Sequence, residues 1–196
     1  MSVSRETEDR LARFEELLRQ WSPRINLISS TTLDDLRHRH IVDSLQLIDL
    51  RPAPGPAWVD LGSGGGLPGL VAAIALQGSG TAVTLIEADQ RKATFLRQAI
   101  RVLSLSDASV LTTRIEAASP QAATTISARA LAPLSTLMAY VARHLRPDGT
   151  ALLMKGRRWQ SEVDEAQAAW SFDMTAHGSI TEPGAAVLEV RNIHAR

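Results

Sequence analysis

The sequence predicts an α/β fold in which a mainly parallel sheet is covered by helices on both faces. From Ala57 onward, apolar runs of strand length alternate with segments of helical periodicity, which is typical of parallel strands joined by helical crossovers. After Lys155 the rhythm changes to two strand-like runs, 171–177 and 186–193, joined by a Pro-Gly turn. This predicts an antiparallel hairpin at the end of the sheet. Before Ala57 the pattern is helical, so a helical extension precedes the sheet.

The first fifty residues predict two helices. Leu11, Phe14 and Trp21 recur at helical spacing, and a turn is expected around Pro23. Thr32 has the character of an N-cap, because two aspartates follow it in what would be the first turn of a second helix.

The stretch RPAPGP, residues 51–56, cannot continue a helix and is interpreted as a linker. It divides the chain into an N-terminal helical extension, 1–56, and a core, 57–196, that we expect to form one compact unit. Within the core, strands are expected near 57–61, 82–86, 109–112, 125–128 and 151–154, and helices near 67–77, 90–103, 133–145 and 162–170.

Composition excludes several classes of function. The chain has no cysteine, which excludes disulfides, thiolate nucleophiles and Cys-ligated zinc. Its 21 Lys and Arg balance 21 Asp and Glu, so any contact with RNA must use a local basic patch. His38 and His40 stand among arginines without the context of metal ligands, so no metal site is predicted. The charged N-terminus and the lack of a long apolar run predict a cytoplasmic protein without a membrane partner.

The most informative segment is DLGSGGGLPG, residues 60–69. It follows a short apolar run and opens an Ala/Leu/Val-rich stretch, so it combines a strand end, a glycine turn and a helix start. Gly62, Gly64 and Gly66 permit close backbone approach, and backbone N–H groups at the helix start can face a polar ligand. A tight turn without a ligand is the alternative, and three alternating glycines followed by Gly69 argue against it.

Ligands of open α/β sheets bind at the carboxyl ends of the strands, so the residues there are the first candidates for a site. Glu87 ends the second strand about 20 residues after the glycine turn, where an acid can reach the ribose hydroxyls of a nucleoside. After the third strand, Ile115 and Glu116 could flank and hydrogen-bond an adenine ring. An amphipathic loop explains that third segment equally well.

Basic residues end the last two parallel strands. Arg129 follows a buried apolar run and needs a partner, which could be a cofactor carboxylate, a neighbouring acid or an RNA phosphate. Lys155 is one of only two lysines and is followed by Arg157, Arg158 and Trp159. A basic cluster beside an aromatic residue is typical of an RNA contact, although a solvated charged loop explains it nearly as well.

Two classes of enzyme fit this nucleoside site. The spacing Gly64-x-Gly66-x-x-Gly69 satisfies the dinucleotide fingerprint of a nicotinamide dehydrogenase. S-adenosylmethionine has a sulfonium cation and no pyrophosphate, and Asp60 before the turn suits that cation better. The terminal hairpin also favours methyl transfer, which we prefer. A cofactor-fold RNA-binding module that has lost its chemistry is a third alternative, and the intact turn with Glu87 argues against it.

Six segments together resemble one family. They are WSPRINLIS (21–29), RHIVDSL (39–45), DLGSGGGLPG (60–69), LIEADQRKATFLRQ (85–98), ISARALAPL (126–134) and LLMKG (152–156). In this order and spacing the chain resembles the ribosomal RNA small subunit methyltransferase G family, also called glucose-inhibited division protein B. The resemblance covers nearly the whole chain and is weakest after residue 156.

The resemblance implies a Rossmann-like class I methyltransferase fold with a seven-stranded sheet. It implies that S-adenosylmethionine is used to methylate N7 of a guanine in 16S rRNA, with S-adenosylhomocysteine as product. Separately from the resemblance, we expect the protein to be a monomer. The acceptor would be 16S rRNA, the small ribosomal subunit or its assembly intermediate. Guanine N7 has an available lone pair and no proton, so catalysis would be positioning without a general acid or base.

The resemblance and the strand ends together give a set of candidate residues. The family implies cofactor positions at Gly62, Leu67, Ile115, Glu116 and Arg129, to which the strand-end analysis adds Gly64 and Glu87. The RNA-binding candidates are Arg129, Lys155, Arg157 and Arg158.

Overall fold

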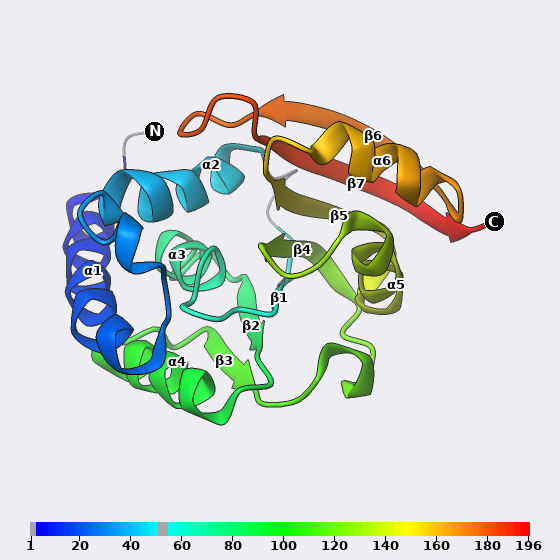
Figure 1. Ribbon diagram of the computed structural model, residues 1–196. Helices are drawn as coiled ribbons and strands as arrows, with labels where there is room; N and C mark the ends of the chain where they lie inside the picture. The colour runs from blue at the N-terminus through cyan, green and yellow to red at the C-terminus, as the bar shows by residue number, and fades with distance from the viewer. Residues whose placement is uncertain (1–2, 51–54) are drawn as a thin grey trace.

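A seven-stranded sheet with helices on both faces forms the centre of the molecule, which confirms the predicted architecture (Figure 1). The computed structural model describes residues 3–50 and 55–196. The strands are β1 (Ala57–Leu61), β2 (Ala82–Ile86), β3 (Ala108–Leu111), β4 (Ala123–Arg129), β5 (Leu145–Lys155), β6 (Trp170–Gly178) and β7 (Ala186–Ala195).

The strand order is β3-β2-β1-β4-β5-β7-β6. The first five strands in this order pair in parallel, and β7 pairs antiparallel with both β5 and β6, as the predicted hairpin requires. The chain order reverses between β1 and β4, and a crevice opens at such a switch point, outside the carboxyl ends of the strands.

Helices from the two halves of the chain cover opposite faces of the sheet. The helices are α1 (Arg5–Ile25), α2 (Asp43–Leu50), α3 (Gly69–Ala75), α4 (Gln90–Val102), α5 (Leu134–His144) and α6 (Trp159–Gln167). Short helical turns at Ser30–Thr32, Arg37–Val42 and Ile115–Ala117 complete the helical structure.

The hydrophobic core consists of two clusters, one on each face of the sheet. Side chains of α1 to α4 form the first cluster, and those of α5 and α6 belong to the second. Strand β5 contributes side chains to both clusters. Leu152 and Met154 belong to the first cluster, and Ala151 and Leu153 belong to the second. This alternation follows from the two-residue period of a strand. It explains why the central strands are apolar on both sides.

The N-terminal helix is longer than the sequence predicts. It begins after the N-cap Ser4, whose hydroxyl accepts a hydrogen bond from the backbone of Thr7, and it continues through Pro23 to Ile25. The expected turn at Pro23 is therefore wrong. A proline in the last turn removes one helical hydrogen bond, and the helix ends only at Asn26, which has a left-handed φ of 49°.

The second helix also starts differently from the prediction. Thr32 does not cap a helix; its hydroxyl donates to the carbonyl of Ser29 within a 3-10 turn. The helix starts as a π-helical segment, Arg37–Val42, that continues directly into α2. Most of the predicted linker lies outside the described residues.

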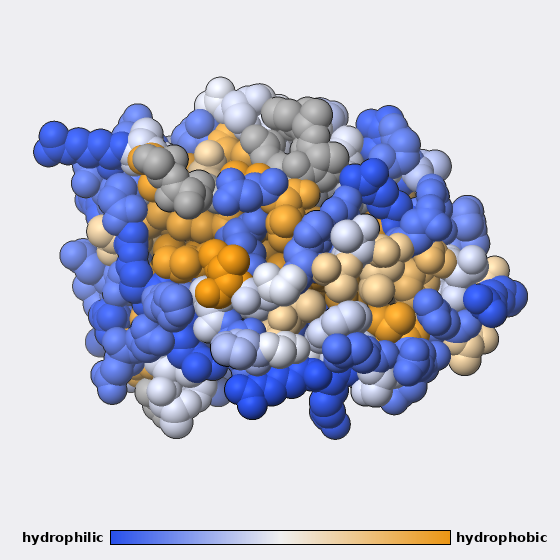
Figure 2. All heavy atoms as spheres, turned by 90° about the horizontal axis from the view of Figure 1, so that it is seen from above, coloured by the Kyte–Doolittle hydropathy of each residue, from blue (hydrophilic) through white to orange (hydrophobic). Residues whose placement is uncertain are grey.

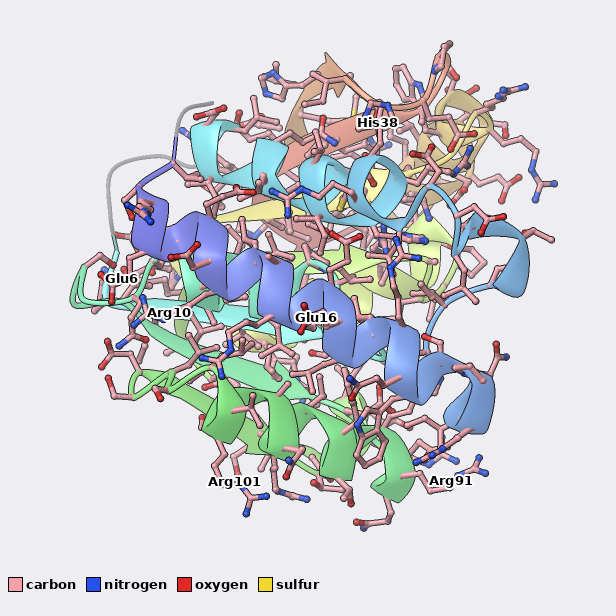
Figure 3. All side chains as sticks on the ribbon, turned by 90° about the vertical axis from the view of Figure 1, so that its left-hand side faces the viewer. Glu6, Arg10, Glu16, His38, Arg91 and Arg101 are labelled. Atoms are coloured by element: carbon pink, nitrogen blue, oxygen red, sulfur yellow. The ribbon has the colours of Figure 1, made fainter. Side chains whose placement is uncertain are left out.

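The helical extension packs on the core through α1. The ring of Trp21 in α1 lies 5.7 Å from that of Phe95 in α4, measured between centroids. Outward-facing positions of both helices carry charged residues, among them the pair Glu6 and Arg10, whose carboxylate and guanidinium lie 2.9 Å apart (Figure 3). The division of the chain at residue 56 stays a prediction.

The face of the molecule seen from above is mostly hydrophilic. Charged and polar residues lie around an apolar area in the middle of this face (Figure 2). Within residues 3–50 and 55–196, Ile180 is the one large hydrophobic side chain that is strongly exposed, at 65%. No helix in these ranges has the length and apolar character needed to cross a bilayer.

Gly69 allows α3 to pack closely on β1 and β2, so a side chain there is expected to destabilise the fold. A Cβ at this position would lie 2.4 Å from Leu85 Cδ2 and 2.5 Å from Asp60 Oδ2, and both residues are fully buried. Gly69→Ala should therefore lower the free energy of unfolding by about 2 kcal/mol in urea titrations. Gly178→Ala is the control, because a Cβ there has open space. Equal stability of the two variants would contradict this account.

Candidate cofactor and acceptor site

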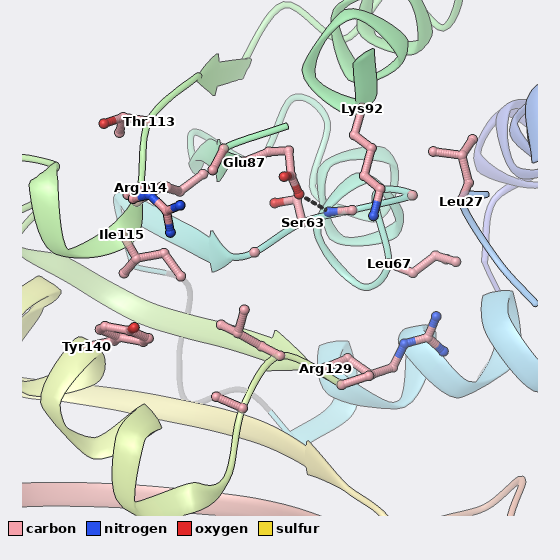
Figure 4. A pocket seen from close by; sticks show the side chains of 18 of the residues that line it. Leu27, Ser63, Leu67, Glu87, Lys92, Thr113, Arg114, Ile115, Arg129 and Tyr140 are labelled. Carbon is pink, nitrogen blue, oxygen red and sulfur yellow. Dashed lines mark hydrogen bonds between the residues drawn. The ribbon is translucent and has the colours of Figure 1, made fainter. Parts of the chain in front are cut away.

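A cavity of about 460 Å³ opens at the carboxyl ends of the parallel strands (Figure 4). Every residue predicted for the cofactor lines it, although these residues come from four separate segments of the chain. They are Gly62, Gly64, Leu67, Glu87, Ile115, Glu116 and Arg129. Leu27, Lys92, Arg114 and Tyr140 also line this cavity, which we call the first cavity. The expectation that a cavity lies at the carboxyl ends of the parallel strands is thus confirmed.

The glycine turn forms one wall of the first cavity. Gly62 and Gly64 have φ angles of +65° and +54°, which residues with side chains rarely adopt. Ser63 fixes the turn, because its N–H donates to Ile86 at the end of β2 and its hydroxyl donates to the carbonyl of Asp60. A Cβ at Gly64 would meet nothing closer than 3.8 Å, so this part of the backbone faces open space. A ligand can therefore approach the turn directly.

Glu87 holds the glycine turn and the start of α4 in place. Its Oε2 accepts a hydrogen bond of 2.7 Å from the Gly64 N–H (Figure 4). Its Oε1 accepts one of 2.8 Å from the Asp89 N–H. A carboxylate has about four acceptor positions, so each oxygen keeps capacity for one more donor. Ribose hydroxyls could use that capacity.

Asp60 does not face the cavity, contrary to the reasoning that matched it to a sulfonium. Its side chain is fully buried beneath Gly69, and its Oδ1 accepts a 2.6 Å hydrogen bond from the hydroxyl of Ser127. That hydroxyl in turn accepts a bond from the indole of Trp58. Burial raises the pKa of Asp60 to about 6, against the opposing effect of the Ser127 hydrogen bond. Asp60 therefore supports the turn from behind, and the polar atoms facing a ligand belong to other residues.

The far wall of the first cavity carries apolar and aromatic side chains. Ile115 lies there near the ring of Tyr140 (Figure 4). The buried His144 lies behind Ile115, with its Nε2 2.9 Å from the Ile115 carbonyl. Burial lowers the pKa of His144, so the ring is neutral at pH 7 and its proton is on Nε2, where the carbonyl accepts it. Glu116 follows Ile115, lines the cavity and is exposed; its contact with an adenine ring stays a prediction.

A second cavity, of about 780 Å³, adjoins the first. All four RNA-binding candidates line it, together with polar residues that the sequence analysis did not select. The candidates are Arg129, Lys155, Arg157 and Arg158, and the additional residues include His40, Asp43 and Glu162. Burial also lowers the pKa of His40 to about 4, so this ring is neutral at pH 7. Leu27, Arg129 and Ala130 line both cavities.

Arg129 lies at the junction of the two cavities. Its guanidinium makes two long contacts, each 3.5 Å, with the Asp43 carboxylate and the Arg39 carbonyl. A neighbouring acid, one of the three partners considered for Arg129 from the sequence, is thus present. The guanidinium has five N–H donors, and most of them stay available for a ligand. Burial lowers the pKa of Arg129, and Asp43 opposes that effect. The next residue, Ala130, has a φ of +50°, an uncommon backbone conformation that often marks functional sites.

Asp43 connects the N-terminal helices to the turn between β6 and β7. Its Oδ1 accepts hydrogen bonds from Thr181, Gln46 and Ser179 at 2.5, 2.8 and 3.3 Å. The motif RHIVDSL contains Asp43, but a search limited to the ends of strands does not find Asp43 because it lies on a helix. The packing of that helix brings Asp43 to the second cavity.

The basic candidates of the second cavity differ in exposure. Arg157 and Arg158 are exposed, and Arg157 lies 3.7 Å from Glu182, measured from Nε to Oε1. Lys155 is enclosed: only 9% of its side chain is accessible, and it pairs with Glu162. The alternative interpretation of this segment as a solvated charged loop is therefore wrong for Lys155. Within the part of the chain that the structure describes, no cluster of His, Asp and Glu could hold a metal ion.

Comparisons with known proteins agree with this geometry. The family model for rRNA small subunit methyltransferase G matches residues 7–191. The chain belongs to this family. It is 55% identical to the Ribosomal RNA small subunit methyltransferase G of Paracoccus denitrificans, with 98% of each chain covered. It is 49% identical to that of Gluconobacter oxydans, with 96% of this chain and 95% of the relative covered.

Solved structures of other methyltransferases share the fold. A SAM-dependent methyltransferase from Aquifex aeolicus superposes with a TM-score of 0.64 at 12% identity, over 79% of this chain and 92% of its own. A ribosomal protein L11 methylase from Lactobacillus delbrueckii subsp. bulgaricus gives a TM-score of 0.62 at 18% identity, over 80% of each chain. These likenesses confirm the predicted class I methyltransferase fold of this family member.

Proposed function

We propose that this protein transfers a methyl group from S-adenosylmethionine to N7 of a guanine in 16S rRNA. Membership of the rRNA small subunit methyltransferase G family supports the reaction class and the RNA substrate. The observation that carries the proposal is the pair of adjoining cavities, one lined by the cofactor candidates and the other by the RNA candidates, with Arg129 in both. A methyl donor and a nucleotide acceptor can meet at that junction.

The residues of the first cavity fit S-adenosylmethionine. A cavity of about 460 Å³ lies in the usual range for such ligands. The backbone at Gly64 is open to close approach, Glu87 retains acceptor capacity for ribose hydroxyls, and Ile115 offers an apolar surface for adenine. Arg129 has donors for the carboxylate of the cofactor. When bound, S-adenosylmethionine supplies a methyl group on a positively charged sulfur.

Positioning and electrostatics account for the chemistry. Guanine N7 presents a lone pair and carries no proton, so no residue has to remove one. His40 and His144, whose pKa values are lowered by burial, are neutral at pH 7 and are not assigned as acid or base. What the chain must do is hold N7 in line with the methyl group at near-attack distance, which supplies a large part of a rate enhancement.

The rim of the second cavity provides the contacts with RNA. Arg157 and Arg158 are exposed there and suit phosphates, so affinity should decline steeply with salt. The target base has to be accessible in a loop or flipped from its stack to enter a cavity. We propose that the protein acts as a monomer in the cytoplasm on 16S rRNA, the small subunit or an assembly intermediate.

The test has a binding part and a mapping part. Calorimetry is expected to show binding of S-adenosylmethionine and none of NAD. Mapping of methylated positions in 16S rRNA from cells lacking the protein is expected to reveal one guanine that loses its N7 methyl group, and the purified protein should restore it. NAD binding without a response to S-adenosylmethionine would favour a dehydrogenase, and cofactor binding without methylation of any rRNA form would favour a binding module.

A further inference from the structure

Lys155 and Glu162 form an enclosed ion pair in the wall of the second cavity. Lys155 Nζ lies 2.5 Å from Glu162 Oε2, and the two side chains are 9% and 23% exposed. The ammonium also donates to the carbonyl of Ala132 at 3.0 Å. Oε2 accepts a further bond, of 2.9 Å, from the N–H of Leu134 at the start of α5. The pair is thus held in one orientation by the backbone on both sides.

This arrangement leaves one donor and one acceptor next to each other. An ammonium has three N–H groups, and the contacts with Glu162 and Ala132 use two of them. A carboxylate has two oxygens, and within the described residues both the ion pair with Lys155 and the hydrogen bond from Leu134 fall on Oε2 of Glu162. The third N–H of Lys155 and Oε1 of Glu162 therefore remain for a ligand of the second cavity.

We propose that Lys155 and Glu162 recognise the O6/N1 edge of the acceptor guanine, an inference that rests on the proposed guanine methylation. In guanine, O6 accepts a hydrogen bond and the adjacent N1–H donates one. Lys155 donates and Glu162 accepts, so the pair matches this edge. Adenine presents an amino donor and an N1 acceptor in the reverse order, which places donor against donor. The ion pair thus selects guanine over adenine.

The position of the pair agrees with the direction in which N7 must point. Ala132 lines the first cavity, and its carbonyl binds Lys155, so the ammonium lies at the boundary between the two cavities. O6 and N7 lie on the same edge of guanine. O6 lies between N1 and N7, so a base whose N1 faces Glu162, which lines the second cavity and not the first, turns N7 toward the first cavity. Recognition and alignment use the same contact.

The contact with Glu162 also favours the reaction. Methylation leaves a positive charge on the purine, and this makes N1–H a stronger donor. Its hydrogen bond to a carboxylate consequently strengthens as the methyl group is transferred, and interactions that strengthen in the transition state raise kcat. Glu162 should therefore affect kcat as well as the choice of base.

The test compares three bases at the target nucleotide. Ligated 16S rRNA fragments, assembled into small subunits where the reaction requires them, carry guanosine, inosine or 2,6-diaminopurine riboside there. Inosine keeps O6, N1–H and N7, whereas diaminopurine keeps N7 but reverses the donor and acceptor at the other two positions. We expect the wild-type protein to methylate inosine within about threefold of guanosine and diaminopurine about 100-fold more slowly.

Two variants should remove this discrimination. Glu162→Gln and Lys155→Met are expected to reduce the guanosine-to-diaminopurine rate ratio about tenfold or more, with a smaller loss of affinity for S-adenosylmethionine. Arg157→Ala is the matched control, because an exposed phosphate contact should slow all three acceptors together and keep the ratio. Thermal unfolding and cofactor calorimetry identify variants that have lost the fold, and Lys155→Arg, which keeps donors, should retain more of the ratio than Lys155→Met.

The outcomes separate this inference from the proposed function. Variants that slow every acceptor equally, with the wild-type ratio intact, would overturn the inference and leave the pair as a brace for the segment before α5. A larger loss of cofactor affinity than of acceptor turnover in Lys155→Met would overturn it as well. A wild-type protein that methylates no guanine in any rRNA form would instead refute the proposed function, and the inference with it.

Discussion

Replacing Glu87 with glutamine is expected to lower the affinity for S-adenosylmethionine about 100-fold, because hydrogen bonds to a charged group contribute up to ~3 kcal/mol. The carboxylate accepts from the N–H groups of Gly64 and Asp89 with different oxygens. A glutamine keeps one acceptor and turns an amide donor toward the other N–H. The glycine turn or the start of α4 then loses its support, and a ribose hydroxyl loses a charged acceptor.

Calorimetric titration with S-adenosylmethionine measures this effect. Glu16→Gln is the matched control, since Glu16 lies on the outer surface of α1, away from the cavity (Figure 3). The control should bind the cofactor as the wild-type protein does. If Glu87→Gln also retained wild-type affinity, Glu87 would serve only the fold, and the cavity would hold the ribose by other groups.

The sheet could be predicted because the apolar runs and the turn residues between them are local features of the sequence that agree with one another. The expected bounds of β1 and β2 are confirmed, since each is a short, largely apolar run that is followed by a clear change of pattern: a glycine turn after β1 and Glu87 after β2. β4 and β5 extend beyond the expected ranges, to Ala123–Arg129 and Leu145–Lys155. Their outer parts contain threonine, arginine and proline, and only pairing with neighbouring strands makes them extended.

The errors at the N-terminus arise from tertiary packing that overrides local preference. Pro23 predicts the end of a helix, yet the helix continues to Ile25, and Trp21 and Ile25 on either side of the proline pack against the core. Thr32 predicts a cap, yet its hydroxyl also lies 2.9 Å from His40 Nε2. The spatial partner that determines its role lies eight residues away, on the helix it was expected to start.

The residues of the candidate site also divide into those that local sequence predicts and those that depend on tertiary packing. Residues at strand ends could be located because topology brings strand ends together. Asp43, Glu162 and Tyr140 come from helices, and their distance from the site depends on how those helices pack. Asp60 was placed on the correct strand but on the wrong side of it, because the sequence does not reveal that Gly69 packs directly over its carboxylate.

Asp60 should make the stability of the protein depend on pH between about 4 and 6. Burial raises its pKa from 3.8 to about 6, so in this range the folded state holds a proton that the unfolded state releases. The stabilisation by the protonated form is complete below pH 3.8 and is lost as the pH rises through 6. A shift of this size corresponds to a loss of ~3 kcal/mol across the range.

The measurement is the free energy of unfolding at several pH values, for the wild-type protein and for Asp60→Asn. Asparagine does not titrate, so the stability of the wild-type protein relative to the variant should fall by ~3 kcal/mol between pH 3 and pH 7. A difference that stays constant with pH would show that Asp60 is charged at no cost in the folded state.

Ser127→Ala tests the cause of this pH dependence. The Ser127 hydroxyl donates to Asp60 Oδ1, which stabilises the charged carboxylate and lowers its pKa. Without that donor the charged form loses its one short hydrogen bond, so the upper end of the pH window should move above 6. A window that moves down instead would mean that the serine stabilises the protonated acid. An upward shift would mean that the carboxylate beneath the glycine turn owes its charge at neutral pH to its protein neighbours, because its burial excludes water.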